Sequence, residues 1–153
     1  MPGDHTGQLT TGYRWPYGPV SVIAPFNFPL EIPTLQVLGA LFMGNKVLLK
    51  PDTLAAPPME QLVRLFHACG MPPEDLDLVH CSGPSMQKLL ESSPVRCTQF
   101  TGSSGTAERL VAALKGKVKI EDAGFDWKLM GPDVSEIDYV AYMIDHDAYA
   151  FGG

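Results

Sequence analysis

The sequence predicts an α/β fold in which a mostly parallel, open sheet is covered by helices on both faces. Along the 153 residues, short apolar runs alternate with longer stretches whose apolar residues recur at helical spacing. This alternation is typical of repeated strand–helix units. Because a crossover helix returns the chain to the same end of the sheet, successive strands are expected to be parallel.

The first strand, turn and helix are expected to follow one another directly. The apolar residues 20–24 predict a buried strand, and a rigid turn bounded by prolines follows at 25–29. The first helix is expected at about 31–42, before a glycine stop signal. The second strand at 46–49 ends before Pro51, because proline cannot continue a central ladder.

Proline marks the start of the second helix and glycine marks its end. Pro57 and Pro58 suit its first turn, and Gly70 is its stop signal. A third strand is expected at 76–80 and a short helix at 86–90. The apolar residues expected on one face of the second helix are Leu62, Leu65, Phe66 and Cys69.

The last third of the chain predicts two more strands, at 97–100 and 118–120. The helix between them starts at the segment 101–105, which is rich in glycine and serine, and ends at Gly116. Residues 127–130 are expected to form another short extended piece. A final helix is indicated by the spacing of Ile137, Val140, Ala141 and Ile144.

Composition is typical of a folded protein with a small-molecule partner. Apolar residues make up 45% of the sequence and charged residues 18%, which argues against disorder. The 11 basic and 17 acidic residues give a net charge of -6, which argues against a nonspecific nucleic-acid surface. The longest uncharged run, from Trp15 to Leu30, contains four prolines, so a membrane-spanning helix is not expected.

The cysteines and histidines argue against disulfides and metal. Cys69, Cys81 and Cys97 form no CxxC pair, and the four histidines are scattered, so neither a disulfide framework nor a zinc site is expected. The three cysteines are interpreted as buried packing residues. Residues 1–8 lack the features of a signal or transit peptide. Either the protein is cytoplasmic or its targeting segment lies outside this chain.

Polar or glycine-containing segments follow each predicted strand. Ligands of an open parallel sheet bind beyond the carboxyl ends of its strands, where the loops converge. We therefore expect a ligand site at this edge of the sheet. The segments are 25–29, 50–52, 81–84, 100–104 and 121–124.

Asn27 and Lys50 each allow a functional and a structural interpretation. An asparagine held between two prolines can donate its amide to an oxygen that becomes negative in a transition state. It can instead close an Asx-type turn, and the position of Asn27 alone favours this second interpretation. Lys50, at the end of an apolar strand, can reach a phosphate or a sugar hydroxyl, or it can simply extend from a buried strand into water.

Two later segments are open to the same two kinds of interpretation. The loop 101–105 offers hydroxyls and backbone N–H groups at a helix start, which suits a phosphate, but an ordinary serine cap explains the same residues. The sequence contains no GxGxxG or Walker A pattern. Glu121 precedes small residues and can act as a general base or be a loop acid, and Asp122 is a competing carboxylate.

Taken together, the order of these segments resembles the aldehyde dehydrogenase superfamily over about residues 12–150. Within the superfamily, residues 12–19 and 121–128 resemble the plant-type Δ1-pyrroline-5-carboxylate dehydrogenases. The motifs that carry the superfamily resemblance are Gly18-Pro19-Val20, Pro25-Phe26-Asn27-Phe28-Pro29, Gly44-Asn45-Lys46-Val47-Leu48-Leu49-Lys50-Pro51, Phe100-Thr101-Gly102-Ser103, and Glu121 before Gly124.

The resemblance implies a Rossmann-like NAD-binding domain and a role for each of ten residues. Asn27 matches the asparagine that stabilises the tetrahedral oxyanion, and Glu121 matches the glutamate that activates water for thioester hydrolysis. Lys50 matches the lysine that holds the adenosine ribose, and Ser103 matches the serine that contacts the pyrophosphate. The other positions implied to bind cofactor are Ile23, Pro25 and Phe26, Gly83 at the adenine pocket, and Thr101 and Gly102 near the nicotinamide.

Three departures from the family pattern affect this interpretation. Thr53 stands where many members have a ribose-binding glutamate, and Asp122-Ala123 replaces the usual Leu-Gly after the general base. The family's nucleophilic cysteine is expected just beyond Gly153 and is absent from the chain. Because the mechanism needs a thiolate to attack the aldehyde, the 153 residues alone are expected to be inactive.

We therefore interpret residues 12–153 as a partial aldehyde dehydrogenase NAD-binding domain and residues 1–11 as a disordered or extended segment. By resemblance, the full-length relative oxidises glutamate γ-semialdehyde, which derives from pyrroline-5-carboxylate, to glutamate with NAD in proline catabolism. It is expected to be a mitochondrial homo-oligomer with a small aldehyde substrate and no nucleic-acid or membrane partner. The alternative is a noncatalytic nucleotide-binding or subunit-interaction module.

Overall fold

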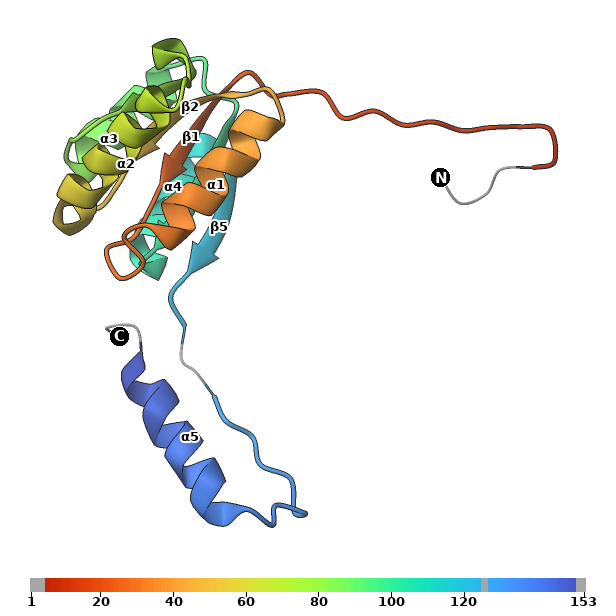
Figure 1. The fold of residues 1–153 in the computed structure, drawn as a ribbon, viewed down its shortest axis with the longest axis vertical. Helices are drawn as coiled ribbons and strands as arrows, with labels where there is room; N and C mark the ends of the chain where they lie inside the picture. Colours follow the sequence, from red (N-terminus) through yellow and green to blue (C-terminus); the bar gives the residue numbers. More distant parts are fainter. Residues whose placement is uncertain (1–4, 125–126, 151–153) are drawn as a thin grey trace.

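The computed structural model describes residues 5–124 and 127–150. Its five strands form a single, fully parallel sheet in the order β3-β2-β1-β4-β5 (Figure 1). The predicted α/β fold with a mostly parallel open sheet is therefore confirmed. The strand bounds are Pro19–Ile23 for β1, Lys46–Lys50 for β2, Leu76–Leu78 for β3, Cys97–Gly102 for β4 and Val118–Asp122 for β5.

Helices connect successive strands, as the alternating pattern predicts. Two short 3-10 turns, η1 and η2, precede α2 and β3 at Thr53–Ala55 and Pro73–Asp75. The helix bounds are Glu31–Phe42 for α1, Ala56–Ala68 for α2, Gly83–Ser92 for α3, Ser104–Leu114 for α4 and Ile137–Tyr149 for α5.

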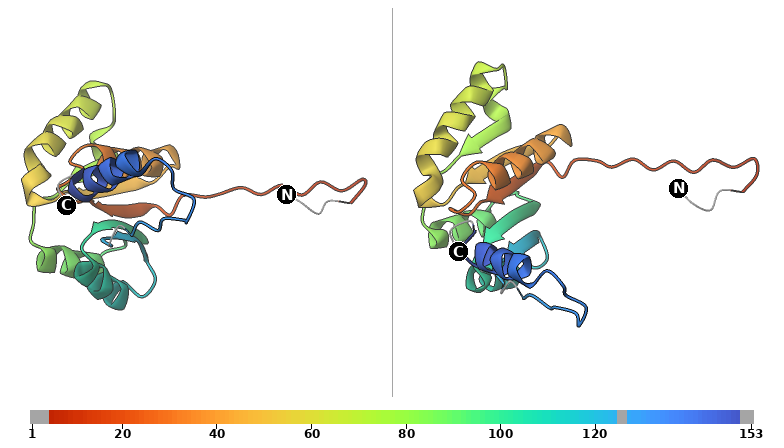
Figure 2. Two further views of the ribbon diagram at one scale, coloured as in Figure 1. Left: turned by 90° about the horizontal axis from the view of Figure 1, so that it is seen from below. Right: turned by 60° about the horizontal axis from the view of Figure 1, so that its bottom comes forward.

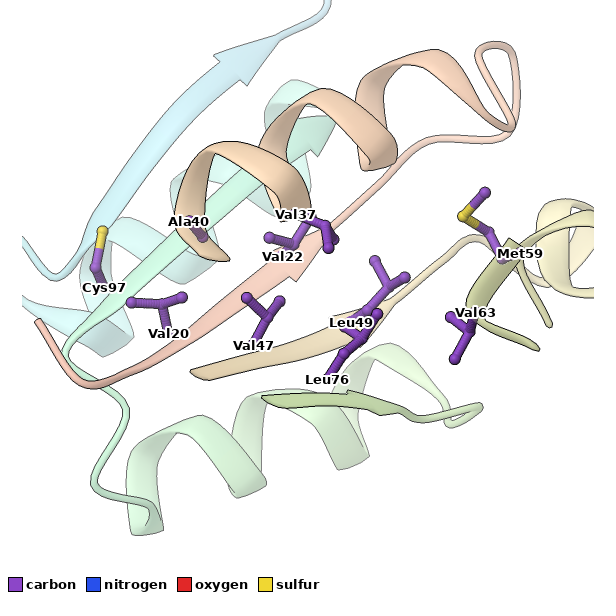
Figure 3. Close-up of a cluster of buried hydrophobic side chains, with 10 residues drawn as sticks. All are labelled: Val20, Val22, Val37, Ala40, Val47, Leu49, Met59, Val63, Leu76 and Cys97. Carbon is purple, nitrogen blue, oxygen red and sulfur yellow. The ribbon is translucent and has the colours of Figure 1, made fainter. Parts of the chain in front are cut away.

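One face of the sheet is covered by α1 and α2. Alternate residues of a strand point to the same face, so Val20 and Val22 of β1 lie beside Val47 of β2. Val37 of α1 and Met59 of α2 pack onto them and are almost completely buried. Figure 3 shows these side chains as one cluster, in which the β-branched residues of the strands meet the helices.

The opposite face is covered by α3 and α4. Phe100 of β4 packs with Met86 and Leu90 of α3 and with Leu110 of α4 in a second buried cluster, the α3–α4 cluster. The hydroxyl of Ser21 on β1 donates to that of Thr98 on β4 at 3.0 Å, which satisfies two buried polar groups. The predicted placement of helices on both faces is thus confirmed.

The strand order creates a switch point between β1 and β4. From β1 the chain adds β2 and then β3 on one side, and it then crosses back to place β4 and β5 on the other side. The connections that leave β1 and β4 therefore diverge to opposite faces of the sheet, which opens a crevice at the carboxyl ends of these two strands.

Some expectations about individual residues are wrong. Leu65 is 55% exposed and Cys69 is exposed, because the buried side of α2 centres on Met59 and Val63. Glu121 does not follow a strand but lies inside β5, since the ladder with β4 continues to Asp122. Residues 127–130 form no strand, although they were expected to be extended.

The two ends of the described chain lie outside the sheet and its helices. Residues 5–17 are exposed and contain no helix or strand, and the N-terminal segment runs away from the sheet (Figures 1 and 2). Helix α5 lies beyond the carboxyl ends of the strands (Figure 1) and has no buried residue. The division of the chain at residue 12 stays a prediction.

Candidate active site

A cavity of about 810 Å³ lies at the carboxyl ends of the strands. Loops after β1, β2, β4 and β5 line it, together with the first turns of α3 and α4. All ten residues singled out in the sequence line this cavity: Ile23, Pro25, Phe26, Asn27, Lys50, Gly83, Thr101, Gly102, Ser103 and Glu121. The structure therefore brings together in space residues that are up to about a hundred positions apart in the chain.

Asn27 lies in the bend that follows β1, where it is half-buried. The backbone before it is held by two hydrogen bonds that extend the β1–β2 ladder: the N–H of Ala24 donates to Lys50 at 3.2 Å, and the N–H of Asp52 donates to Ala24 at 3.0 Å. The loop that carries Asn27 thus starts from a fixed point beside the end of β2.

Lys50 is the last residue of β2 and is half-buried. No ion pair involves its ammonium among the described residues, so its charge is available to a ligand in the cavity. The neighbouring Asp52 carboxylate accepts a hydrogen bond from the N–H of Leu54 at 2.9 Å and caps η1. The acid next to Lys50 is therefore occupied by the backbone.

The two helix starts at the cavity differ in their capping. The hydroxyl of Ser82 accepts a hydrogen bond from the N–H of Ser85 and caps α3. The hydroxyl of Ser103 instead donates to the hydroxyl of Thr106 at 3.1 Å, and no side chain caps α4. The serine-cap interpretation is thus wrong for Ser103, and the start of α4 presents backbone N–H groups that suit an anion.

The end of β4 is shaped by glycine. An added Cβ atom at Gly102 lies 2.8 Å from Cζ of Phe100, closer than packing allows. At Gly83 an added Cβ meets nothing within 4 Å, so crowding does not require glycine there. Gly102 therefore leaves room for the buried ring of Phe100, two residues earlier in β4, at the edge of the cavity.

Glu121 stands directly opposite Thr101 in the β4–β5 register, and its side chain is exposed. The N–H of Ala123 donates to the carbonyl of Gly102 at 3.0 Å, which holds the end of β5 against β4. Glu121 and Asn27 come from opposite sides of the switch point and line the same cavity. A carboxylate and an amide donor so placed can act on one substrate from two directions.

None of the three cysteines lines the cavity. Cys97 is buried in β4, and this burial raises the pKa of its thiol, an effect that the charge of Lys119 offsets only in part. Cys81 is half-buried against the α3–α4 cluster, whereas Cys69 is exposed and its interpretation as a buried packing residue is wrong. The described residues contain no group of ligands that could hold a metal ion.

Sequence reasoning missed several residues of the cavity. Lys128 and the Asp147 carboxylate of α5 form an ion pair there, although they are widely separated in sequence. The Lys128 hydrogen bond is the main cause that lowers the pKa of Asp147. No pattern predicts this pairing, because it depends on where α5 lies. The other missed residues at the cavity are Ala24, Ile32, Met86, Gln87, Thr106, Leu110 and Ala150.

The strand order and the cavity at the switch point define a Rossmann-like α/β domain. The chain belongs to the aldehyde dehydrogenase family, because the model of that family matches residues 1–126. Over its whole length it is 58% identical to the mitochondrial Δ1-pyrroline-5-carboxylate dehydrogenase 12A1 of Arabidopsis thaliana, of which it covers 28%. The superfamily expected from the motifs is therefore confirmed.

Solved structures agree with this assignment. An aldehyde dehydrogenase from Bartonella henselae shares the fold with a TM-score of 0.81 and 23% identity, covering 90% of this chain and 30% of that one. PnpE in complex with nicotinamide adenine dinucleotide matches with a TM-score of 0.68 and 32% identity, covering 72% and 24% respectively. The chain thus spans less than a third of the length of these relatives. None of the helices among residues 5–124 and 127–150 is long and apolar enough to cross a membrane.

Proposed function

We propose that this chain forms the cofactor-binding region of an NAD-dependent dehydrogenase that oxidises glutamate γ-semialdehyde to glutamate in proline catabolism. The observation that carries the proposal is the meeting of Asn27, Glu121 and the proposed cofactor residues in one cavity at the switch point. The 58% identity to the Arabidopsis enzyme supports the choice of substrate and a mitochondrial location. The complete enzyme is proposed to be a homo-oligomer.

The residues of the cavity fit a dinucleotide. A volume of about 810 Å³ is in the range of small-molecule sites. The free start of α4 suits the pyrophosphate, and the ammonium of Lys50 suits the ribose hydroxyls. Bound NAD supplies the acceptor for the hydride that leaves the substrate. The preference for NAD over NADP is part of the same proposal.

Asn27 and Glu121 have separate roles at the reacting carbon. The Asn27 amide donates to the oxygen that becomes negative when the aldehyde carbon turns tetrahedral. The Glu121 carboxylate accepts a proton from the water that hydrolyses the acylated enzyme. Because no cysteine of the chain lines the cavity, we propose that the attacking thiolate comes from outside these 153 residues.

The test separates binding from turnover. We expect the purified 153-residue chain to bind NAD in titration calorimetry, and Lys50→Met to weaken that binding by about ten- to a hundredfold, since hydrogen bonds to a charged group contribute about 1.5–3 kcal/mol. With pyrroline-5-carboxylate and NAD, the chain should form no NADH. Absence of NAD binding contradicts the proposal, and NADH formation above that of Asn27→Ala contradicts the inactivity of the chain.

A noncatalytic nucleotide-binding module is the second candidate. The observation that favours it is the location of all three cysteines away from the cavity. Supplying the remainder of the Arabidopsis relative in trans distinguishes the two functions. Recovery of NADH formation, lost again with Glu121→Gln, supports the enzyme, whereas NAD binding without such recovery supports the module.

A further inference from the structure

Gln87 of α3 lines the cavity away from the residues proposed to act on the aldehyde. Phe100 packs into the α3–α4 cluster, so the next residue of β4, Thr101, and its register partner Glu121 point to the opposite face of the sheet. The part of the cavity on the α3–α4 side is therefore a separate end. Its lining residues are Gly83, Met86 and Gln87 of α3 and Thr106 and Leu110 of α4.

This end of the cavity suits the flat ring of a base. Met86 and Leu110 are buried and give it an apolar floor, and the half-buried Gln87 adds an amide at its edge. A base packs its faces on apolar side chains, while a small number of polar groups contact its rim. A dinucleotide that places its nicotinamide beside Asn27 and Glu121 has its adenine left for this end.

Glu91 determines which way the amide of Gln87 faces. Nε2 of Gln87 donates a hydrogen bond to Oε1 of Glu91 at 2.8 Å, one turn further along α3. A carboxylate only accepts hydrogen bonds, so the amide nitrogen, and not the amide oxygen, must face Glu91. One N–H of the amide is used in this way. The second N–H and Oε1 of Gln87 make no hydrogen bond to the described residues.

An amide with one free N–H and a free oxygen matches the edge of adenine. Glutamine makes two hydrogen bonds to this base: it donates to N7 and accepts from the 6-amino group. Hypoxanthine has an oxygen in place of that amino group, so Oε1 of Gln87 would face a second acceptor. The amide cannot reverse to donate there, because its oxygen would then face the carboxylate of Glu91.

We propose that Gln87 selects adenine in the cofactor, by two hydrogen bonds from an amide that Glu91 orients. Gln87 is the binding residue and Glu91 is a positioning residue. The proposal rests on the NAD-binding function proposed above, and it adds a residue that recognises the identity of the base.

The experiment compares NAD with nicotinamide hypoxanthine dinucleotide in calorimetric titrations of the 153-residue chain. The unsubstituted chain should bind NAD about five- to tenfold more tightly, at the lower end of the range for a bidentate amide contact because Gln87 is only half-buried. Gln87→Met should weaken NAD binding to the level of the hypoxanthine dinucleotide and so remove the preference.

Glu91→Met tests the orientation of the amide. Without the carboxylate, the Gln87 amide is free to turn and donate to the oxygen of hypoxanthine. This variant should therefore bind the hypoxanthine dinucleotide more tightly than the unsubstituted chain does, while NAD binding stays within about twofold. A purely structural contribution of Glu91 to α3 would weaken the binding of both dinucleotides. Circular dichroism checks that each variant folds.

Glu60→Met and Gln61→Met are the matched controls. Glu60 accepts a hydrogen bond from Arg64 one turn further along α2 at 2.6 Å, and Gln61 is an exposed glutamine beside it. Neither residue lines the cavity. The same two substitutions on this helix should leave the preference for NAD unchanged.

The outcomes that overturn the proposal are distinct from failure of the proposed function. Equal binding of the two dinucleotides by the unsubstituted chain, or an unchanged preference in Gln87→Met, overturns base selection alone. An unchanged preference in Glu91→Met overturns the positioning role of Glu91. Absence of NAD binding by the unsubstituted chain overturns the proposed function and base selection together.

Discussion

Gly102 affects both the packing of the core and the shape of the cavity, because glycine has no Cβ atom. Replacing it with alanine brings the new Cβ to 2.8 Å from Cζ of the buried Phe100 ring, which is held by the α3–α4 cluster. Overpacking of this kind costs about 1–3 kcal/mol, so Gly102→Ala should lower the free energy of unfolding in urea by about that amount.

Gly105→Ala is the control for this substitution. Gly105 lies in the first turn of α4, and an added Cβ there meets nothing within 4 Å. Since alanine is favoured over glycine in a helix by about 0.5–1 kcal/mol, this variant should be as stable as the unsubstituted chain or more stable. Equal stability of the two alanine variants contradicts the close contact with Phe100.

At the level of elements, α5 is held by few contacts. Ile137, Tyr139 and Tyr142 are 70%, 63% and 64% exposed, and no residue of the helix is buried. Its ion pair with the preceding segment joins Lys128 to Asp147, and its own Tyr142 and His146 rings stack with centroids 6.0 Å apart. A helix of 13 residues without a buried face is marginal by itself, and this ion pair joins it to the segment that precedes it.

The ion pair predicts the titration of Asp147. The Lys128 hydrogen bond and charge hold the pKa of the Asp147 carboxyl below its ordinary value, with a smaller contribution from His146. Because the folded-state pKa is lowered, the contact is fully present above the ordinary carboxyl pKa of about 3.9 and is lost as the pH falls through the lowered value.

Carbon-detected NMR of the Asp147 carboxyl checks this prediction. Its midpoint should lie below the ordinary value in the unsubstituted chain and rise toward it in Lys128→Met. High salt should raise it as well, since the pair lies near the surface. The same midpoint in both chains would show that Lys128 does not contact Asp147 in solution.

At the scale of the whole molecule, the sequence predicted the elements, the parallel sheet and the helices on both faces, but it could not predict the order of the strands. The helix expected at about 31–42 matches α1, because its proline and glycine boundaries are local signals. The order of the strands depends on pairing across the sheet, which no local pattern contains. For the same reason the exposure of Leu65 and the contact between Gln36 and Thr101 were missed: both are set by which strands lie beneath the helices.

The site was predictable as a set of segments, but the partners of its side chains were not. The rule that ligands bind beyond the carboxyl ends of parallel strands was enough to select the segments that contain Asn27, Lys50 and Glu121. Whether Ser103 caps its helix depends on a rotamer that the sequence does not determine, and the structure joins it to Thr106 instead.

The two buried clusters predict that the sheet and its four covering helices fold as a unit without α5. Among residues 119–124 and 127–150, none belongs to either cluster, and Val118 itself packs at the edge of the second one. A chain that ends at Gly124 should therefore keep its free energy of unfolding within about 1 kcal/mol, as expected for loss of surface contacts only. It should also associate less, because Trp127, Leu129 and the tyrosines of α5 are removed from the exposed surface.

A chain that ends at Gly116 is the control: it loses β5, so β4 becomes an edge strand and the second cluster loses Val118. Urea unfolding should then show a loss of at least about 2 kcal/mol for this shorter chain, as expected when an edge strand and part of a core are removed. A comparable loss for the chain ending at Gly124 would mean that α5 stabilises the sheet through contacts other than those of the two clusters.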